Sequence, residues 1–513
     1  MQASLLLDRE TGDAPPHALS QTFTSQLLRS FAPAPQHRFN GDATLSDDES
    51  ENRPHNIRAH GAGVSSLAVE KFDGRILVSG GTEGAIKIWD LEACGATQHG
   101  TYTFRPASTI ARCPPAAAAN NYRVGSGAGG GGGGGGGGKG MGHTHGITHL
   151  AFYPFDPDAF LSSSYDKTLR LWSTATSQLS ACFHLNATIY SHSTSPVADH
   201  LIVACATQHP HVRLVDLRSG SAVQALAAHG GPVLSTAWSP RQEHVLASGH
   251  ADGRVRVWDV RRAGGPLAQL DQEDSLGVVH RFEHAAAAGA PGPPSVSRAS
   301  AQAHDDAVNG LAWTPDARHI LSAGLDSRIR MWDAATGANT LTGFGSAVQN
   351  RHAKTAPLIA TPPCLSDPRR SRRHGDVLFW ANDREILVLD LHDGKVVTRL
   401  RSPGAANVNP VGPGGAAEMG RNRISCLAWR SAGGGGASVG PIMGGGNSIG
   451  ALYSAHLDGH IRAWMPQVPG PDDFDEDDEA DDVDGDEESR RRRKRKAVDD
   501  AYRSLMGKQI TFT

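Results

Sequence analysis

The sequence lacks several features that mark well-defined classes of protein. Its six cysteines are scattered and form no C-x-x-C pair, which gives no zinc or disulfide framework and is typical of a reducing compartment. No apolar run approaches the roughly 20 residues of a membrane span, and Leu5-Leu6-Leu7 is too short for a secretory signal. The net charge is −4, so no field of the whole protein attracts nucleic acid. We expect a soluble, intracellular protein without a cofactor.

Motifs of common enzyme classes are missing as well. The run Gly129–Gly138 is followed by Lys139-Gly140, so it is not the phosphate-binding loop G-x-x-x-x-G-K-[ST], and we interpret it as a flexible linker. There is no G-x-S-x-G nucleophile elbow. The sequence therefore does not predict an enzyme.

A motif of serine, acid and tryptophan recurs five times at a fixed internal spacing. A Ser is followed four residues later by an Asp or Glu, and six residues after that by a Trp. The five units are Ser79/Glu83/Trp89, Ser162/Asp166/Trp172, Ser248/Asp252/Trp258, Ser322/Asp326/Trp332 and Ser454/Asp458/Trp464. Between acid and Trp, apolar and basic residues alternate, as in Val255-Arg256-Val257. This alternation predicts a strand with one buried face, preceded by a turn that holds the acid.

The same spacing finds two degraded copies, which bring the number of repeats to seven. They are Cys205/His209/Val215 and Phe379/Asp383/Leu389. The repeats that end at Ser173, Asp216 and Asp259 are 43 residues apart, which is the period of a four-stranded propeller blade. In these features the chain resembles the WD-repeat family over roughly residues 57–466. The resemblance implies an all-β fold, a closed seven-bladed WD40-type β-propeller.

The resemblance also implies a structural role for the repeat residues. In the family, a His that opens the blade forms a hydrogen-bonded chain with the Ser, the Asp and the Trp. Here these roles fall to His229/Ser248/Asp252/Trp258 and to His304/Ser322/Asp326/Trp332. A buried carboxylate needs such partners, and five copies at blade spacing favour a scaffold over a hydrolase. His143-x-His145-x₃-His149 could be imagined as a metal site, but it lies where a blade should open, so we expect no metal there.

Residues 1–35 precede the propeller and are predicted to be helical in two pieces. After the apolar patch Leu5–Leu7, a second helix face is predicted from residues spaced by four, ended by Pro33 and Pro35: Leu19, Phe23, Leu27 and Phe31. Such a helix either packs on the propeller or fits a partner's groove, and we favour the partner. Residues 36–56 are polar and acidic and are predicted to be a linker. We expect residues 57–60 to supply the outer strand that closes the last blade.

The resemblance implies a propeller domain over residues 57–468, and composition predicts that flexible insertions interrupt it. The predicted insertions are residues 114–142, 263–300, 346–376, 402–420 and 431–448. The third of them carries a basic cluster that could contact an acidic partner, although a solvated loop is the simpler interpretation: Arg369, Arg370, Arg372 and Arg373.

The C-terminal tail, residues 469–513, is predicted to be disordered. Residues 472–488 contain thirteen Asp and Glu, and a basic run follows. The run consists of Arg490, Arg491, Arg492, Arg493, Lys494, Arg495 and Lys496. It is typical of a nuclear import signal or a nucleic-acid patch. Because the acidic block weakens non-specific DNA binding, we favour import into the nucleus and expect no dominant contact with nucleic acid.

The end of the fourth repeat, Trp258-Asp259-Val260-Arg261, narrows the function. An Arg at this position is expected at the rim of the blade, where its planar head suits a carboxylate or carbonyl of a partner. W-D-x-R resembles the box shared by substrate receptors of cullin-4 ubiquitin ligases, which dock on the damaged-DNA-binding protein 1 adaptor. The resemblance implies that Trp258 holds the blade, Asp259 orders the turn and Arg261 contacts the adaptor. It also implies apolar adaptor-binding anchors in the N-terminal segment: Leu5, Leu6, Leu7, Leu27 and Leu28.

Longer stretches, several of them outside the repeat motif, resemble one group of these receptors, among them YSHSTSPV (190–197) and WSPRQEHVLASGHADGRVRVWDVRR (238–262). The resemblance implies a non-catalytic substrate-recognition subunit that joins the adaptor, cullin-4 and a RING subunit. Such a subunit acts in transcription-coupled nucleotide excision repair, where it engages stalled RNA polymerase II through the Cockayne syndrome group B remodeller. The insertions and the sixth repeat depart from the group. The alternative is a nuclear WD-repeat scaffold for chromatin or RNA-processing complexes, which would not need Arg261.

Overall fold

The computed structural model describes twelve parts of the chain: residues 11, 25–42, 57–93, 101–114, 142–198, 200–262, 265–276, 301–356, 358–362, 376–401, 422–431 and 450–467. The chain divides into two compact units, Met1–Pro466 and Gln467–Thr513. The predictions made for the tail of residues 469–513 lie outside the described residues. No helix among the described residues is long and apolar enough to cross a membrane.

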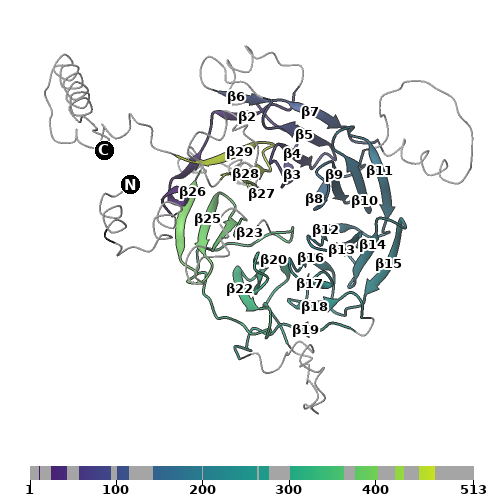
Figure 1. The fold of residues 1–513 in the computed structure, drawn as a ribbon, viewed down its shortest axis with the longest axis vertical. Coiled ribbons are helices and arrows are strands. Elements are labelled where there is room, and N and C mark those ends of the chain that lie inside the picture. The colour runs from purple at the N-terminus through teal and green to yellow at the C-terminus, as the bar shows by residue number, and fades with distance from the viewer. Residues whose placement is uncertain are drawn as a thin grey trace, which may run out of the picture. The chain divides into compact units, whose positions relative to one another are not determined.

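The first unit is a ring of seven β-sheets, each of which forms one blade of a propeller (Figure 1). Six blades have four strands and the fifth has three, extended by a single bridge between Trp332 and Asn339. Each blade begins with the strand nearest the axis of the ring and continues outward. This confirms the all-β, seven-bladed propeller that the resemblance to the WD-repeat family implies.

The strands follow the repeats in order. Blade 1 consists of β3 (Val64–Val69), β4 (Ile76–Gly81), β5 (Ile86–Asp90) and β7 (Pro106–Ile110). Blade 2 consists of β8 (Ile147–Phe152), β9 (Ala159–Ser164), β10 (Thr168–Ser173) and β11 (Leu179–His184). Blade 3 consists of β12 (Ile189–Thr194), β13 (Ile202–Thr207), β14 (Val212–Asp216) and β15 (Ser221–Leu226). Blade 4 consists of β16 (Val233–Trp238), β17 (Val245–His250), β18 (Val255–Asp259) and β19 (Ala268–Gln269).

The remaining blades include the least regular repeat and the junction of the chain's two ends. Blade 5 consists of β20 (Val308–Trp313), β21 (His319–Gly324) and β22 (Arg328–Asp333). Blade 6 consists of β23 (Leu358–Ala360), β24 (Val377–Ala381), β25 (Glu385–Asp390) and β26 (Val396–Arg401). Blade 7 consists of β27 (Ile424–Ser431), β28 (Gly450–His456), β29 (Ile461–Pro466) and the N-terminal β1 (Phe31–Pro33).

The acid-to-Trp run of each intact repeat forms the third strand of its blade, as the alternation predicts. In β18, Val255 and Val257 are fully buried between blades, and Trp258 is only 1% exposed. The equivalent tryptophans of the other four intact repeats are also buried: Trp89, Trp172, Trp332 and Trp464. Each such ring removes about 200 Å² of surface from water, so the tryptophans contribute a large part of the interblade core.

The ring is closed by β1, and the prediction that residues 57–60 supply this strand is wrong. β1 pairs antiparallel with β29 in a register that places Phe31 opposite Pro466 and Pro33 opposite Trp464. Residues 57–60 form no strand. Pro33 and Pro35 resemble helix terminators in the sequence, but Pro is also tolerated in the outermost strand of a sheet, where one side needs no hydrogen bonds.

The N-terminal helix is correspondingly shorter than predicted. One helical turn spans residues 25–29, and Phe31 belongs to β1 rather than to the helix face. Leu5–Leu7, Leu19 and Phe23 lie outside the described residues.

Part of the predicted linker is a strand. Within residues 36–56, β2 (His37–Phe39) pairs in parallel with β6 (Tyr102–Phe104) beside blade 1. Phe39 stacks on Phe104 with ring centroids 4.9 Å apart and meets Trp89 edge-on at 5.3 Å. The linker prediction is wrong here because two aromatic rings bury the segment, whereas residues 43–56 lie outside the described residues.

Two predicted insertions also contribute strands. Segment 263–300 contains β19, the outer strand of blade 4, and segment 346–376 contains β23, the inner strand of blade 6. These strands are two and three residues long, which is too short for a periodic pattern to stand out. Residues 402–420 and the basic cluster Arg369–Arg373 lie outside the described residues.

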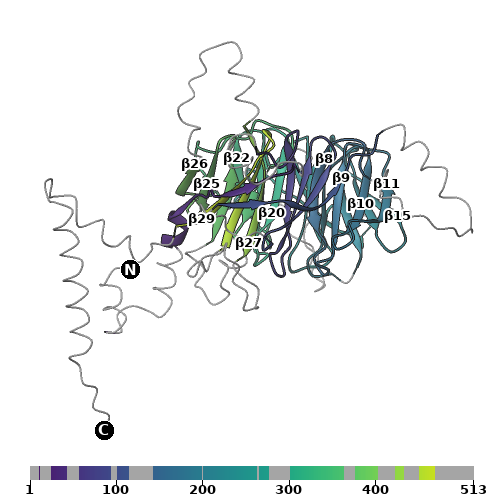
Figure 2. The same ribbon diagram turned by 90° about the horizontal axis from the view of Figure 1, so that it is seen from above.

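The strands run between the two faces of the ring (Figure 2). Because neighbouring strands are antiparallel, the segment before each inner strand and the turn between the second and third strands share one face. We call this the tetrad face; there, His304 and Ala303 of blade 5 donate backbone hydrogen bonds to Gly253 of blade 4. The opposite face carries the turns between the first and second and between the third and fourth strands. It includes Arg261, and we call it the Arg261 face.

We predict that Phe31→Ala weakens the closure of the ring. Phe31 is 6% exposed and stacks on Trp429 at 5.8 Å, so truncation removes a buried ring from blade 7. The free energy of unfolding should fall by about 3 kcal/mol, measured by urea denaturation followed by tryptophan fluorescence. Arg29→Ala, an exposed position in the same segment, is the control and should change it little. Equal stability of the two variants would contradict this role of β1.

Candidate functional site

A hydrogen-bonded tetrad of Trp, Ser, His and acid holds blades 1, 2 and 5. In blade 5, Trp332 Nε1 donates to Ser322 Oγ at 2.8 Å, and His304 Nε2 lies 2.7 Å from the same oxygen. His304 Nδ1 lies 3.1 Å from Asp326 Oδ1. Because a carboxylate only accepts, Nδ1 donates to Asp326 and Nε2 accepts the Ser322 hydroxyl proton. This confirms the chain expected in blade 5.

Blades 1 and 2 repeat this arrangement with different acids. His60 Nε2 lies 2.8 Å from Ser79 Oγ, and His60 Nδ1 lies 2.7 Å from Glu83 Oε1. In blade 2, His143 joins Ser162 and Asp166 at 2.6 and 2.8 Å. Burial alone would raise the pKa of Glu83, but the hydrogen bond from His60 holds it below its usual range.

Blade 4 uses a different histidine from the one expected. His229 is exposed, and only its carbonyl oxygen takes part, as the acceptor of Arg256 at 2.7 Å. His250 Nε2 instead lies 2.8 Å from Ser248 Oγ, which accepts from Trp258 Nε1 at 2.7 Å. The prediction for His229 is therefore wrong.

The residue two positions after the Ser decides which histidine is used. In blade 5 this residue is Gly324, where a Cβ would lie 2.5 Å from His304 Nδ1, and in blade 2 it is Ser164. A small residue at this position therefore accompanies the histidine before the inner strand. In blades 4 and 7 the same position holds His250 and His456, which occupy that space themselves.

An arginine replaces the histidine as partner of the acid in these two blades. Arg256 donates to Asp252 at 3.0 Å, and Arg462 donates to Asp458 at 2.9 Å. Burial raises the pKa of Asp458, but hydrogen bonding to His460 and the charge of Arg462 lower it overall to about 2. The alternating basic residues thus neutralise the turn acids rather than forming a free basic surface.

The inner strands of blades 2 and 3 bury a pair of histidines. His149 and His192 meet edge-on with ring centroids 4.7 Å apart, and burial lowers the pKa of His149 to about 4. His143 belongs to its tetrad, so the three histidines of the imagined metal site do not converge. Within the described residues, no group of three or more His, Cys, Asp or Glu side chains is placed to hold a metal ion.

Arg261 lies in the turn after β18 and is held in place by Asp259. Its backbone N–H donates to Asp259 Oδ1 at 3.0 Å, and its side chain donates through Nε at 3.0 Å and a terminal nitrogen at 2.9 Å. Asp259 is 2% exposed, whereas the Arg261 side chain is 60% exposed. The Arg261 hydrogen bond lowers the pKa of the Asp259 carboxyl, which therefore stays ionised. The guanidinium is fixed in direction and open to a partner.

The surroundings of Arg261 combine charge with exposed apolar groups. An open depression of about 370 Å³ is lined by Val197, Arg241, Gln242, Glu243, His244, Val245 and Arg261. Four large apolar side chains in turns of the same face are exposed by 38–50%: Phe72, Phe155, Val197 and Leu201. Their contribution escaped sequence reasoning because single apolar residues in turns carry no periodic signal.

The remaining predicted site residues have two different outcomes. Leu27 and Leu28 are 3% and 4% exposed and pack into the core of blades 6 and 7 with Phe379 and Trp464. They are therefore not free anchors for an adaptor, because the following β1 ties this turn to the propeller. Leu5, Leu6 and Leu7 lie outside the described residues. So do Arg490, Arg491, Arg492, Arg493, Lys494, Arg495 and Lys496 of the nuclear localisation prediction.

We predict that the buried histidines make the propeller sensitive to acid. Folded His149 stays neutral down to about pH 4, whereas histidine in an unfolded chain takes up a proton near pH 6.5. The folded pKa is the lower one, so the free energy of unfolding is highest above about pH 6.5 and falls towards pH 4, by about 1.4 kcal/mol per pH unit for each such histidine.

His149→Asn should reduce this slope, measured by urea denaturation between pH 6.5 and 4.5. His229→Asn removes an exposed histidine and should leave the slope at the wild-type value. An unchanged slope in His149→Asn would show that this side chain is not buried and neutral.

Comparison with known proteins agrees with the blade structure. The family described as WD domain, G-beta repeat matches residues 52–90, 139–173, 220–259 and 296–333. These segments end in the third strands of blades 1, 2, 4 and 5.

Three curated relatives illustrate the similarity. WD repeat-containing protein ATCSA-1 of Arabidopsis thaliana is 28% identical over 386 residues, which cover 66% of this chain and 77% of that protein. Ribosome biogenesis protein YTM1 of Phaeosphaeria nodorum is 27% identical over 53% of this chain and 54% of its own length. Radiation-sensitive protein 28 of Saccharomyces cerevisiae is 26% identical over 37% of this chain and 38% of its own length.

The similarity to ATCSA-1 extends beyond the four matched repeats and spans most of that protein. It agrees with the stretches at residues 190–197 and 238–262, which resemble the Cockayne syndrome group A protein. Taken with the seven blades, these matches show a β-propeller that contains WD repeats and is similar in sequence to ATCSA-1.

Proposed function

We propose that this protein is the substrate-recognition subunit of a ubiquitin ligase built on cullin-4 and the damaged-DNA-binding protein 1 adaptor. The observation that carries the proposal is the exposed guanidinium of Arg261, fixed by the buried Asp259 at the rim of blade 4. A preoriented arginine loses little conformational freedom when it forms a planar pair of hydrogen bonds with a carboxylate or carbonyl.

The wider Arg261 face supports an adaptor interface. Arg261 supplies a directional polar contact, and Phe155, Val197 and Leu201 supply exposed apolar area on blades 2 and 3. Val197 lines the same depression as Arg261, and a charged anchor beside an apolar group is a composition expected of a protein interface hot spot. Since Leu27 and Leu28 are buried, the docking energy must come from this face and from residues nearer the N-terminus.

The second part of the proposal is a role in transcription-coupled nucleotide excision repair. It is supported by the similarity to ATCSA-1 and to a relative named for radiation sensitivity. In this role the protein engages stalled RNA polymerase II together with the Cockayne syndrome group B remodeller. Its contribution is proximity, because ubiquitin transfer takes place on the conjugating enzyme bound to the RING subunit. We also propose a nuclear location, from the basic run at residues 490–496.

A second candidate function is a scaffold in ribosome biogenesis. The relatives named ribosome biogenesis protein YTM1 and ribosome biogenesis protein WDR12 homolog are 27% and 26% identical, and each match covers 54% of the relative's length. The ATCSA-1 match covers 77% of that protein, which favours the ligase receptor.

We predict that Arg261→Ala strongly reduces association with the adaptor. Loss of an anchoring arginine at the centre of an interface commonly weakens binding about tenfold or more. The tagged full chain and its variant would be immunoprecipitated from cells, and co-purifying adaptor and cullin-4 would be quantified. Arg318→Ala, an exposed arginine in a turn of the neighbouring blade on the same face, is the control and should bind like wild type.

Three outcomes of this immunoprecipitation contradict part or all of the proposal. Adaptor missing from the wild type rejects the ligase receptor. Equal binding by wild type and Arg261→Ala would agree with a ligase receptor but would show that Arg261 is not the residue that anchors the adaptor. Equal loss in both arginine variants shows a general charge effect rather than a specific anchor.

The ribosomal alternative predicts a different distribution of the same tagged chain. On a sucrose gradient of nuclear extract, a ligase receptor should sediment with cullin-4 and away from pre-ribosomal particles. Co-sedimentation with those particles that survives Arg261→Ala would favour the scaffold.

A further inference from the structure

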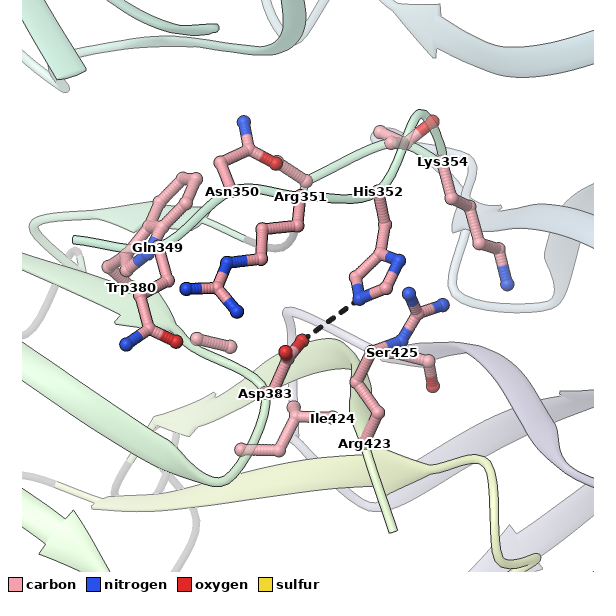
Figure 3. A pocket seen from close by; sticks show the side chains of 13 residues that line it. Gln349, Asn350, Arg351, His352, Lys354, Trp380, Asp383, Arg423, Ile424 and Ser425 are labelled. Atoms are coloured by element: carbon pink, nitrogen blue, oxygen red, sulfur yellow. Dashed lines mark hydrogen bonds and ion pairs between the residues drawn. The ribbon is translucent and has the colours of Figure 1, made fainter. Parts of the chain in front are cut away.

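The tetrad face carries a small polar pocket that adaptor docking on the opposite face leaves free (Figure 3). One wall is the segment of residues 349–356 before β23. The other walls are the end of β24, with Trp380, the turn after it, with Asp383, and the residues that lead into β27, with Arg423. The pocket therefore lies between blades 6 and 7, beside the segment that enters blade 6.

The degraded sixth repeat creates this pocket. Phe379 and Leu389 stand where intact repeats have the Ser and the Trp, so His352 and Asp383 pair at 3.2 Å without the rest of a tetrad. Their side chains are 48% and 38% exposed, whereas His304 and Asp326 of blade 5 are 0% and 8% exposed. A pair that is structural in the other blades faces solvent here.

The wall that carries the cationic groups is rigidly held. Asn309 and Asn350 hydrogen-bond each other at 2.7 and 3.0 Å and are almost fully buried. Asn309 Nδ2 also donates to the carbonyl oxygens of His352 at 2.8 Å and Lys354 at 2.9 Å. These bonds fix the backbone of a segment that the sequence suggests is a solvated loop, and so they preorganise its side chains.

The lining has more positive than negative charge. Arg351 and Arg423 line it together with a single acid, Asp383, while the Lys354 ammonium donates to the carbonyl oxygen of Ser65 at 3.2 Å. Arg423 Nε is buried and has no hydrogen-bond partner in the described part of the chain. Arg351 extends over the pocket, and no described residue pairs with its guanidinium (Figure 3). A buried charged donor without a partner is costly, so an anionic acceptor in the pocket would be stabilised.

Size and lining narrow the nature of this anion. The enclosed space is about 30 Å³, which is room for about two water-sized groups. Nucleotide-sized ligands need a pocket of several hundred Å³. Trp380 is 1% exposed and offers no ring on which a base could stack. We propose that this pocket binds the carboxylate of an Asp or Glu in an acidic segment of a partner protein, with Arg351 and Arg423 as its donors.

The inference goes beyond the proposed function and does not depend on it, because Arg261 lies on the other face. If both hold, the Arg261 face binds the adaptor while the tetrad face receives an acidic segment of the protein that is recruited.

The test uses the purified full chain and a fluorescein-labelled oligo-glutamate peptide that carries a photo-cross-linker. Affinity is measured by fluorescence polarisation, and cross-linked residues are mapped by mass spectrometry. Arg351→Gln and Arg423→Gln should each weaken binding about tenfold, and cross-links should fall on residues 349–355 and 423–425. Lys167→Gln, which removes an exposed cation from a turn of blade 2 on the same face, should bind like wild type.

Several results would overturn the proposal. Cross-links confined to the basic run 490–496, or equal loss of affinity in Lys167→Gln, would show general attraction of a polyanion. Equal affinity for an oligo-glutamine peptide would exclude a carboxylate site. Tighter binding of a phosphoserine peptide or of oligo-thymidine at the same residues would show that the pocket binds a phosphate group rather than a carboxylate. The amount of adaptor that co-purifies with Arg351→Gln should equal that of wild type. Failure of the carboxylate-binding proposal can therefore be told apart from failure of the ligase proposal.

Discussion

The hydrogen bond from a buried tryptophan to a serine is the interaction on which the rest of the propeller depends. In all five intact repeats, the Trp of the third strand donates to the Ser of the second, as Trp258 does to Ser248 at 2.7 Å. This bond fixes the register of two strands and lets a polar ring nitrogen lie in an apolar interior at little cost. The serine then accepts or donates towards a histidine, and that histidine or an arginine neutralises the acid of the turn. Each of these five blades is thereby tied from its core to the tetrad face, and the turns on the opposite face take no part in the network.

Sequence predicts this framework well, because a side chain buried in a fixed network tolerates few substitutes. The seven repeats and the strand that contains each Trp follow from spacing and alternation, whereas the propeller and the tetrad of blade 5 follow from the resemblance to the WD-repeat family. The same reasoning fails for His229, because the choice of histidine depends on space rather than on order along the chain. A signal was present: Gly324 follows its Ser by two residues, whereas His250 stands at the equivalent position. A bulky residue there excludes the preceding histidine.

Other features could not be predicted, because they arise from contacts between segments far apart in the chain. In the sequence, Phe31 and Pro33 resemble the end of a helix. They form a strand because β29, more than 400 residues away in the chain, pairs with them. Leu27 and Leu28 resemble an exposed apolar face until blades 6 and 7 cover them. The only sequence signal for the pocket beside Asp383 is that the sixth repeat lacks the Ser and the Trp of the motif. A degraded repeat weakens a blade, but it also frees polar groups that an intact repeat would bury.

The pairing of β1 with β29 has a consequence for biosynthesis. The first residues of the closing sheet leave the ribosome early, but their partner at Ile461–Pro466 is made more than 400 residues later. At 5–20 residues per second, Phe31 waits about 20 to 90 s before it can be covered. During that interval blade 7 lacks its strands and Leu27 and Leu28 are uncovered, so the nascent chain presents an apolar segment to chaperones. The closing pair therefore forms only after β29 has been made, and a chain truncated before β29 cannot form it.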